Sequence, residues 1–217
     1  FTVGRSTDWV RLSTRLEGDV VLDSTVAGYV IPSAGTTIAA GATVRVPAGV
    51  VLKGYSDNFG SSTLIVQGSL VLDGTPAAPV VLTTTGDDTA GGDYGNDGQG
   101  EVGHWTGVRL TGSGSFTSHH AEIRHGNLEL LAAGTNATVQ TTAITDGDIL
   151  AQDSGRLLVE DSSITGTGSG FGVALYVGTP TIRRTRISAE HTGVALQGSV
   201  GATLDGLIQT DAAINPG

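Results

Sequence analysis

An acidic, glycine-rich segment at residues 87–105, DDTAGGDYGNDGQGEVGHW, carries side chains that could bind a metal ion. Calcium takes about six to eight oxygen ligands, and carboxylate and amide groups supply them. The sequence therefore predicts a Ca²⁺ site whose ligands are Asp87, Asp88, Asp93, Asn96 and Asp97. The alternative is a solvated surface loop, because Asp, Asn and Gly also favour turns.

The same segment matches only part of the EF-hand pattern. Asp93, Asp97 and Gly98 agree with the first acidic position, the third acidic position and the glycine of that loop. Gly95 replaces the second acidic position, and His104 stands where a bidentate Glu is required. We therefore do not expect an EF-hand here.

A histidine and an aspartate recur at one phase of a sequence repeat. His125 follows Ile123 by two residues, as Asp146 follows Ile144. If the repeat forms stacked coils, the two side chains lie one coil apart and could act as an acid/base pair. The alternative is a pair of polar turn residues.

Charged residues on the strand-like segments have two interpretations. Arg109 and Glu129 lie one repeat apart, as do Glu160 and Arg183, which favours ion pairs between neighbouring strands. The alternative is a shallow oligosaccharide groove lined by Glu122, Glu160, Arg183 and Arg186. Such a groove needs aromatic platforms, and only Tyr176 is close in sequence.

Composition excludes several classes of function. The net charge of −10, from 11 basic and 21 acidic residues, opposes nucleic-acid binding, which needs Lys and Arg to displace counterions. Lys53 is the only lysine, and without cysteine neither disulfides nor thiolate metal sites can form. No apolar run approaches the roughly 20 residues of a membrane span, so we expect no membrane insertion.

The second half of the chain repeats with a period of 20 to 24 residues. One column consists of Ile123, Ile144, Ile164, Ile187 and Ile208. A second column consists of the pairs Val108/Leu110, Leu128/Leu130, Ile149/Ala151, Val173/Leu175 and Val194/Leu196. A third consists of Val139, Val159, Ile182 and Leu204. Apolar residues alternate within short runs, which indicates strands.

Short strands that recur at this period without helices favour a parallel β-solenoid, since ordinary parallel crossovers need a dozen or more residues. A β-sandwich is the alternative fold. At the amino terminus, Asp8 with Trp9, Leu12 and Leu16 predicts a short capping helix, and a first strand over the same residues is the other interpretation. Some cap is expected, because exposed strand edges promote aggregation.

Two segments of the first half carry a family resemblance. GTTIAAGATVRVPAGVVLKG (35–54) and STLIVQGSLVLDGTPAAPVVLTTT (62–85) each hold three apolar runs between Gly or Pro turns, and Trp105, Gly107 and Val108 form a W-x-G-V strand after the acidic segment. The combination resembles right-handed parallel β-helix repeat proteins of bacterial secreted and cell-surface polypeptides, which share the superfold of pectate lyases. The resemblance implies a right-handed parallel β-helix and an exported protein, and the sequence repeat sets its coils at about 20 to 24 residues.

We therefore expect an all-β chain with an amino-terminal cap and first strand at 1–28 and a parallel β-helix at 29–217, interrupted by an excursion at 86–104. The predicted function is a non-catalytic extracellular or cell-surface scaffold, an adhesin-type module that contacts polysaccharide or another surface protein. The alternatives are a polysaccharide lyase or glycoside hydrolase acting on acidic polysaccharide, and a carbohydrate-binding module. No Arg-x-Lys or Gly-His-Gly motif is present, so the catalytic residues of β-helix enzymes do not transfer.

Overall fold

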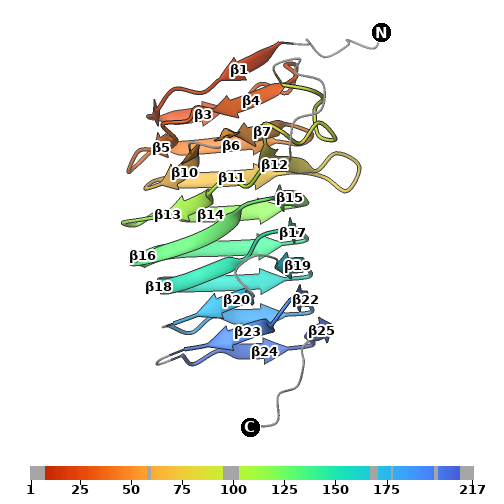
Figure 1. Ribbon diagram of the computed structural model, residues 1–217. Coiled ribbons are helices and arrows are strands. Elements are labelled where there is room, and N and C mark those ends of the chain that lie inside the picture. The colour runs from red at the N-terminus through yellow and green to blue at the C-terminus, as the bar shows by residue number, and fades with distance from the viewer. Residues whose placement is uncertain are drawn as a thin grey trace.

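The chain forms a parallel β-solenoid in which successive coils stack along one axis (Figure 1). The computed structural model describes residues 8–57, 60–94, 103–166, 171–176, 178–197 and 200–210. Over these residues the structure contains strands and no helix. The predicted all-β solenoid is confirmed, and the sandwich alternative is wrong.

Each coil contributes one strand to a nine-stranded sheet. In stacking order these strands are β1 (Trp9–Arg11), β4 (Gly28–Ile31), β7 (Val51–Gly54), β12 (Val80–Thr84), β15 (Ala121–Arg124), β17 (Ala143–Thr145), β19 (Ser163–Gly166), β22 (Arg186–Ala189) and β25 (Ile208–Thr210). All their pairings are parallel, and they form one wall of the solenoid.

The other walls are two arms of a 14-stranded sheet. The first arm contains β2 (Arg15–Leu16), β5 (Thr36–Ile38), β10 (Thr63–Val66), β13 (Gly107–Leu110), β20 (Phe171–Leu175) and β23 (Thr192–Leu196). The second contains β3 (Asp19–Val21), β6 (Thr43–Pro47), β11 (Ser69–Asp73), β14 (Ser115–His119), β21 (Thr181–Arg183) and β24 (Thr203–Asp205). Long strands β16 (Asn127–Gln140) and β18 (Ile149–Glu160) belong to both arms. A small antiparallel hairpin, β8 (Ser56–Asp57) and β9 (Gly60–Ser61), lies between β7 and β10 in the chain.

The predicted apolar columns are present in register, with one exception. The isoleucine column contains Ile123, Ile144, Ile164 and Ile187. The other two columns pair as predicted from coil to coil. The prediction for Ile208 is wrong, because Gln209 lies opposite Ile187 and Ile208 is 54% exposed. The register of β25 on β22 is therefore shifted by one residue from the predicted column.

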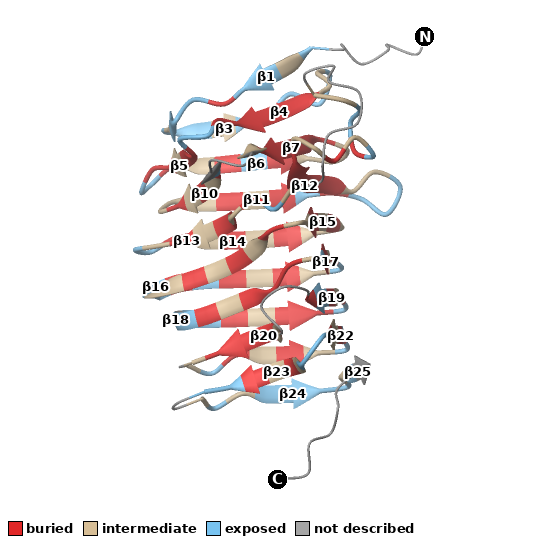
Figure 2. Cartoon of the chain, in the orientation of Figure 1, coloured by how far each residue is buried: buried red, intermediate tan, exposed pale blue. Residues whose placement is uncertain are grey.

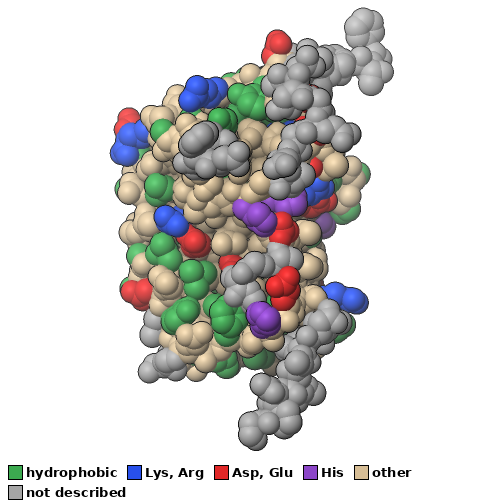
Figure 3. Space-filling model, in the orientation of Figure 1, with side chains coloured by type: hydrophobic (Ala, Val, Ile, Leu, Met, Phe, Trp, Pro, Cys, Tyr) green, Lys and Arg blue, Asp and Glu red, His purple; other side chains and the backbone are tan. Residues whose placement is uncertain are grey.

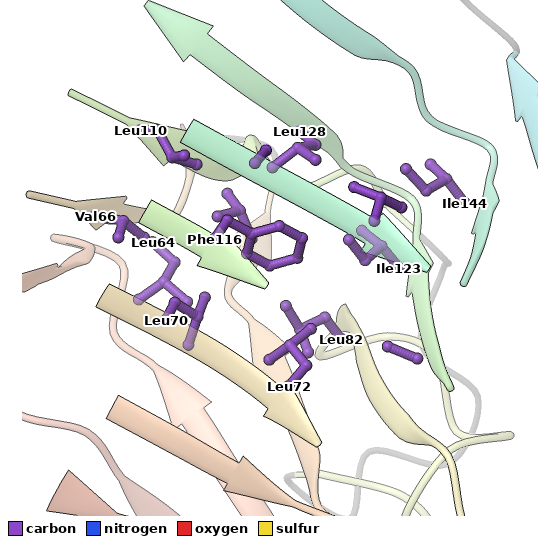
Figure 4. Close-up of a cluster of buried hydrophobic side chains, with 14 of the residues drawn as sticks. Leu64, Val66, Leu70, Leu72, Leu82, Leu110, Phe116, Ile123, Leu128 and Ile144 are labelled. Atoms are coloured by element: carbon purple, nitrogen blue, oxygen red, sulfur yellow. The ribbon is translucent and has the colours of Figure 1, made fainter. Parts of the chain in front are cut away.

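The core lies inside the stack and contains side chains from all three walls. Buried and partly exposed residues alternate along β14 and at both ends of β16 (Figure 2), because successive strand residues point to opposite faces. Figure 4 shows the inward side chains of neighbouring coils in contact, with Phe116 among leucines and isoleucines. Leucine, isoleucine and valine suit these positions because each coil must present the same shape to the next.

The predicted capping helix is wrong for residues 8–18. Trp9–Arg11 pairs in parallel with Gly28–Val30, and Leu16 pairs with Ile38, so the strand interpretation is confirmed. β1 forms backbone hydrogen bonds with β4. A helix at this end would leave the N–H and C=O groups on that side of β4 without partners. The apolar spacing that indicated a helix instead places Leu12 in the solenoid core.

Candidate functional site

The turn between the second arm and the nine-stranded sheet is built on a column of left-handed residues. In five successive coils one residue of this turn has a positive φ, between 47° and 57°, and only the last of these five residues is a glycine. They are His120, Thr141, Asp161, Arg184 and Gly206. The amide groups of the turn bond to the next coil, as in Thr141 N to Glu160 O at 3.2 Å and Arg184 N to Asp205 O at 2.9 Å. The stack thus holds non-glycine residues in a left-handed backbone conformation that glycine adopts most easily. Their side chains lie in a row along one edge of the solenoid.

Buried hydroxyl groups support this turn from inside. Ser118 and Thr142 share a hydrogen bond of 2.9 Å, and Thr142 Oγ1 donates to the Gln140 carbonyl at 2.8 Å. Ser162 Oγ donates to the Glu160 carbonyl at 2.7 Å. These bonds satisfy polar groups that burial would otherwise leave without partners.

A network of ion pairs surrounds Glu160 at the same edge. Arg183 Nε lies 2.9 Å from Glu160 Oε1, Arg184 NH2 contacts the same oxygen, and Gln140 donates to Oε2 at 3.0 Å. The hydrogen bonds from Arg183, Gln140 and Arg184 lower the pKa of Glu160 to about 2. Arg184 also bonds both oxygens of Asp161, which raises the pKa of Arg184 and lowers that of Asp161. The predicted Glu160–Arg183 pair is confirmed.

A groove of about 650 Å³, the turn groove, crosses four coils beside this network. Its lining residues are Thr141, Thr142, Ala143, Asp161, Ser162, Ser163, Arg184, Thr185, Arg186, Gly206 and Ile208. Of the residues predicted to line an oligosaccharide groove, only Arg186 is among them. Glu160 and Arg183 bind each other next to it, and Glu122 bonds to Arg124 on β15. None of the lining residues is aromatic, and Tyr176 is not one of them.

Two histidines share one carboxylate oxygen where the excursion returns to the solenoid. His125 Nδ1 lies 2.8 Å from Asp146 Oδ2, which confirms that these two residues meet across one coil. His104 Nε2 lies 3.0 Å from the same oxygen. His125 and Asp146 both adopt a φ of 55°. Figure 3 shows histidine and acidic side chains gathered about halfway along the stack.

His104 is not part of the predicted His125–Asp146 pair because it lies outside the sequence repeat. Its position follows from Trp105, which is buried and donates its indole N–H to the Arg124 carbonyl at 3.0 Å. A side chain at Gly54 or Gly126 would collide with the Trp105 ring, so glycine is required at both positions. The W-x-G motif at Trp105 could have indicated this position, because it places the preceding residue, His104, at the turn where the chain re-enters the solenoid.

Asp87, the first of the five predicted calcium ligands, is buried and hydrogen-bonded to protein donors. Thr83 Oγ1 donates to Asp87 Oδ2 at 2.7 Å, Arg124 NH1 donates to the same oxygen at 3.2 Å, and Thr89 donates twice to Oδ1. Burial opposes ionisation, but the bonds from Thr89, Thr83 and Arg124 outweigh it and lower the Asp87 pKa to about 2. Glu122 and Asp87 likewise outweigh burial to raise the pKa of Arg124.

The other predicted ligands give a mixed fit to calcium. Asp88 Oδ1 is buried without a hydrogen-bond partner, which is the one observation that favours a bound cation. Asp93 lies in the same segment, and Asn96 and Asp97 fall outside the described residues. Within the described part of the chain, no three acidic or histidine side chains form a group that could hold a metal ion. The predicted Ca²⁺ site therefore stays a prediction.

No protein-family model, curated protein or solved structure matches the chain. Across the described ranges, no helix has the length and apolarity that a membrane crossing requires.

Proposed function

We propose that the chain is a non-catalytic β-solenoid scaffold, an adhesin-type module of a secreted or cell-surface protein. The observation that supports this most directly is the use made of its charged side chains. Arg183 and Arg184 both pair with Glu160, and Arg109 Nε lies 2.5 Å from Glu129 Oε2. Charged side chains that pair with side chains on neighbouring coils stabilise the stack. A catalytic site, in contrast, needs at least one such group free to contact the substrate.

The resemblance to secreted and surface β-helix proteins supports the setting that we propose, and the acidic charge of −10 suits contact with neutral or cationic surfaces. Partners of the proposed scaffold are a polysaccharide or another surface protein. Calcium within residues 87–97 belongs to the proposal as a stabilising ion. A calcium-dependent rise in Tm that EDTA reverses would support it, because binding to the folded state alone stabilises that state.

The alternative is a lyase or hydrolase acting on acidic polysaccharide, and two observations favour it. The turn groove presents Arg186, which can attract a carboxylate, beside Asp161. The His125–Asp146 pair offers an imidazole with a carboxylate on one ring nitrogen, an arrangement found in general bases. A carbohydrate-binding module is the third proposal. The turn groove has no aromatic side chain in its lining on which a sugar ring could stack, so this proposal has less support than the other two.

One experiment separates the scaffold from the enzyme. The protein is incubated with acidic and neutral polysaccharides, with and without Ca²⁺, and new reducing ends and unsaturated products are measured. The scaffold proposal expects none. Turnover that is lost in Asp146→Asn or Arg186→Ala, but retained in Arg109→Met on the first arm, would establish the enzyme instead.

Binding without turnover is tested separately, by titrating the protein with oligosaccharides from the same panel and measuring heat. Saturable binding that Arg186→Ala weakens would favour a carbohydrate-binding module that uses the turn groove. Binding that Arg186→Ala leaves unchanged would place the contact elsewhere on the scaffold.

A further inference from the structure

Lys53, the only lysine, is fully buried on the outer side of the nine-stranded sheet. It lies on β7 next to Leu52, which points into the core, so the Lys53 side chain points away from it. An outward lysine on a solenoid wall is ordinarily solvated, because burial of an ammonium group is costly without hydrogen bonds. Something other than the sheet must therefore cover Lys53.

The cover is the segment 87–92, which we call the strap. Lys53 Nζ donates to the carbonyl oxygen of Asp87 at 2.9 Å and to that of Gly92 at 2.6 Å. These carbonyls are the two ends of the strap, so one ammonium group fixes both. Lys53 Nζ also lies 4.8 Å from the centre of the Trp9 ring, a favourable distance for a cation–π contact.

The strap crosses several strands of the wall. Its first residue, Asp87, bonds to Arg124 of β15. In its middle, Ala90 packs with Val51 and Val81, and Trp9 packs against this cluster. The ring of Trp9 then contacts Tyr94 edge-on, with centroids 5.7 Å apart. The strap thus connects β15, β12 and β7 to β1.

β1 is at one edge of the nine-stranded sheet, and among the described strands it pairs only with β4. The inward residue Val10 is 38% exposed, so the core alone holds this strand weakly. Trp9 packs over Gly28, where any side chain would collide with the ring, and reaches the strap. Edge strands need such covers, because their unpaired backbone groups can recruit other chains.

We propose that Lys53 is the internal cation of the strap, and that the strap is a device that fixes the edge strand β1 to the body of the solenoid. Oxygen atoms converge on the ammonium group here as they would converge on a metal ion. The inference concerns the stability of one end of the fold and is independent of the proposed function.

The test is hydrogen exchange measured strand by strand on the full chain. Lys53→Met keeps the length of the side chain and removes its charge and donors. We expect protection of the β1 amides to fall by at least about tenfold while that of β19 and β22 is unchanged. Arg109→Met, which removes a cation from a partly buried pair on another wall, should leave β1 unchanged.

Unchanged protection of β1 in Lys53→Met would overturn the proposal, and so would an equal loss in every strand. A second variant covers failure of Lys53→Met to fold. Trp9→Leu retains both bonds from Lys53 to the strap and removes the aromatic contact with β1, so β1 should lose protection while residues 87–92 keep theirs. Equal protection of β1 in Trp9→Leu and the parent chain would also contradict the strap.

Discussion

Replacement of Asp87 by asparagine should destabilise the protein at neutral pH and have little effect in strong acid. The Asp87 pKa falls from 3.8 to about 2 on folding. At about 1.36 kcal/mol per pKa unit this corresponds to about 2.5 kcal/mol. Solvent screens part of the network, so we expect Asp87→Asn to cost about 1 to 2 kcal/mol at pH 7.

The pH dependence follows from the sign of the shift. Because the folded state has the lower pKa, the stabilisation is complete above the unfolded value of 3.8 and is lost as the pH falls toward 2. Urea unfolding of both proteins from pH 7 to about pH 2.5 should therefore show a difference that narrows below about pH 4. Asp73→Asn, at an exposed position on β11, is the control and should change stability by less than about 0.5 kcal/mol. A difference between Asp87→Asn and the parent chain that is the same at both ends of the pH range would refute the reasoning.

Two further substitutions test the stack itself. Ile144→Ala removes a 1% exposed side chain between two coils and should cost about 2 to 5 kcal/mol in unfolding experiments, whereas Thr145→Ala, its outward neighbour, should cost less than about 0.5 kcal/mol. Equal costs would mean that the columns do not carry the stability. Thr141→Asn replaces a β-branched residue at φ 47° by one that tolerates this conformation, so Tm should rise by about 2–4 °C; Thr138→Asn, within strand β16, should not raise it. A fall in Tm for Thr141→Asn would show that its Oγ1, which accepts from His120 N at 3.1 Å, outweighs the strain.

The walls of the solenoid were predictable because stacking converts spatial register into sequence period. Ile123, Ile144 and Ile164 recur at nearly constant spacing since each must contact the one before it. The same logic predicted that His125 would meet Asp146. It failed at Ile208, because β25 pairs with β22 one residue out of the register that the sequence repeat predicts.

The turn column and the strap were not predictable, for different physical reasons. Thr141 and Arg184 are residue types that rarely adopt positive φ, so residue type gave no sign of the turn at these two positions. The strap depends on contacts between Lys53 and residues 34 and 39 positions away, and no periodic pattern encodes them. The helix predicted at Trp9 failed for a related reason, because pairing with the next coil outweighs local spacing.

The most direct test of the central claim, that this solenoid is a scaffold whose polar side chains bind one another, is product formation from acidic polysaccharides. With the wild-type chain, with Asp146→Asn and with Ca²⁺ present or absent, we predict no reducing ends or unsaturated products above the enzyme-free blank. Products that accumulate with the wild-type chain and disappear with Asp146→Asn would contradict the scaffold and assign catalysis to the histidine–aspartate cluster.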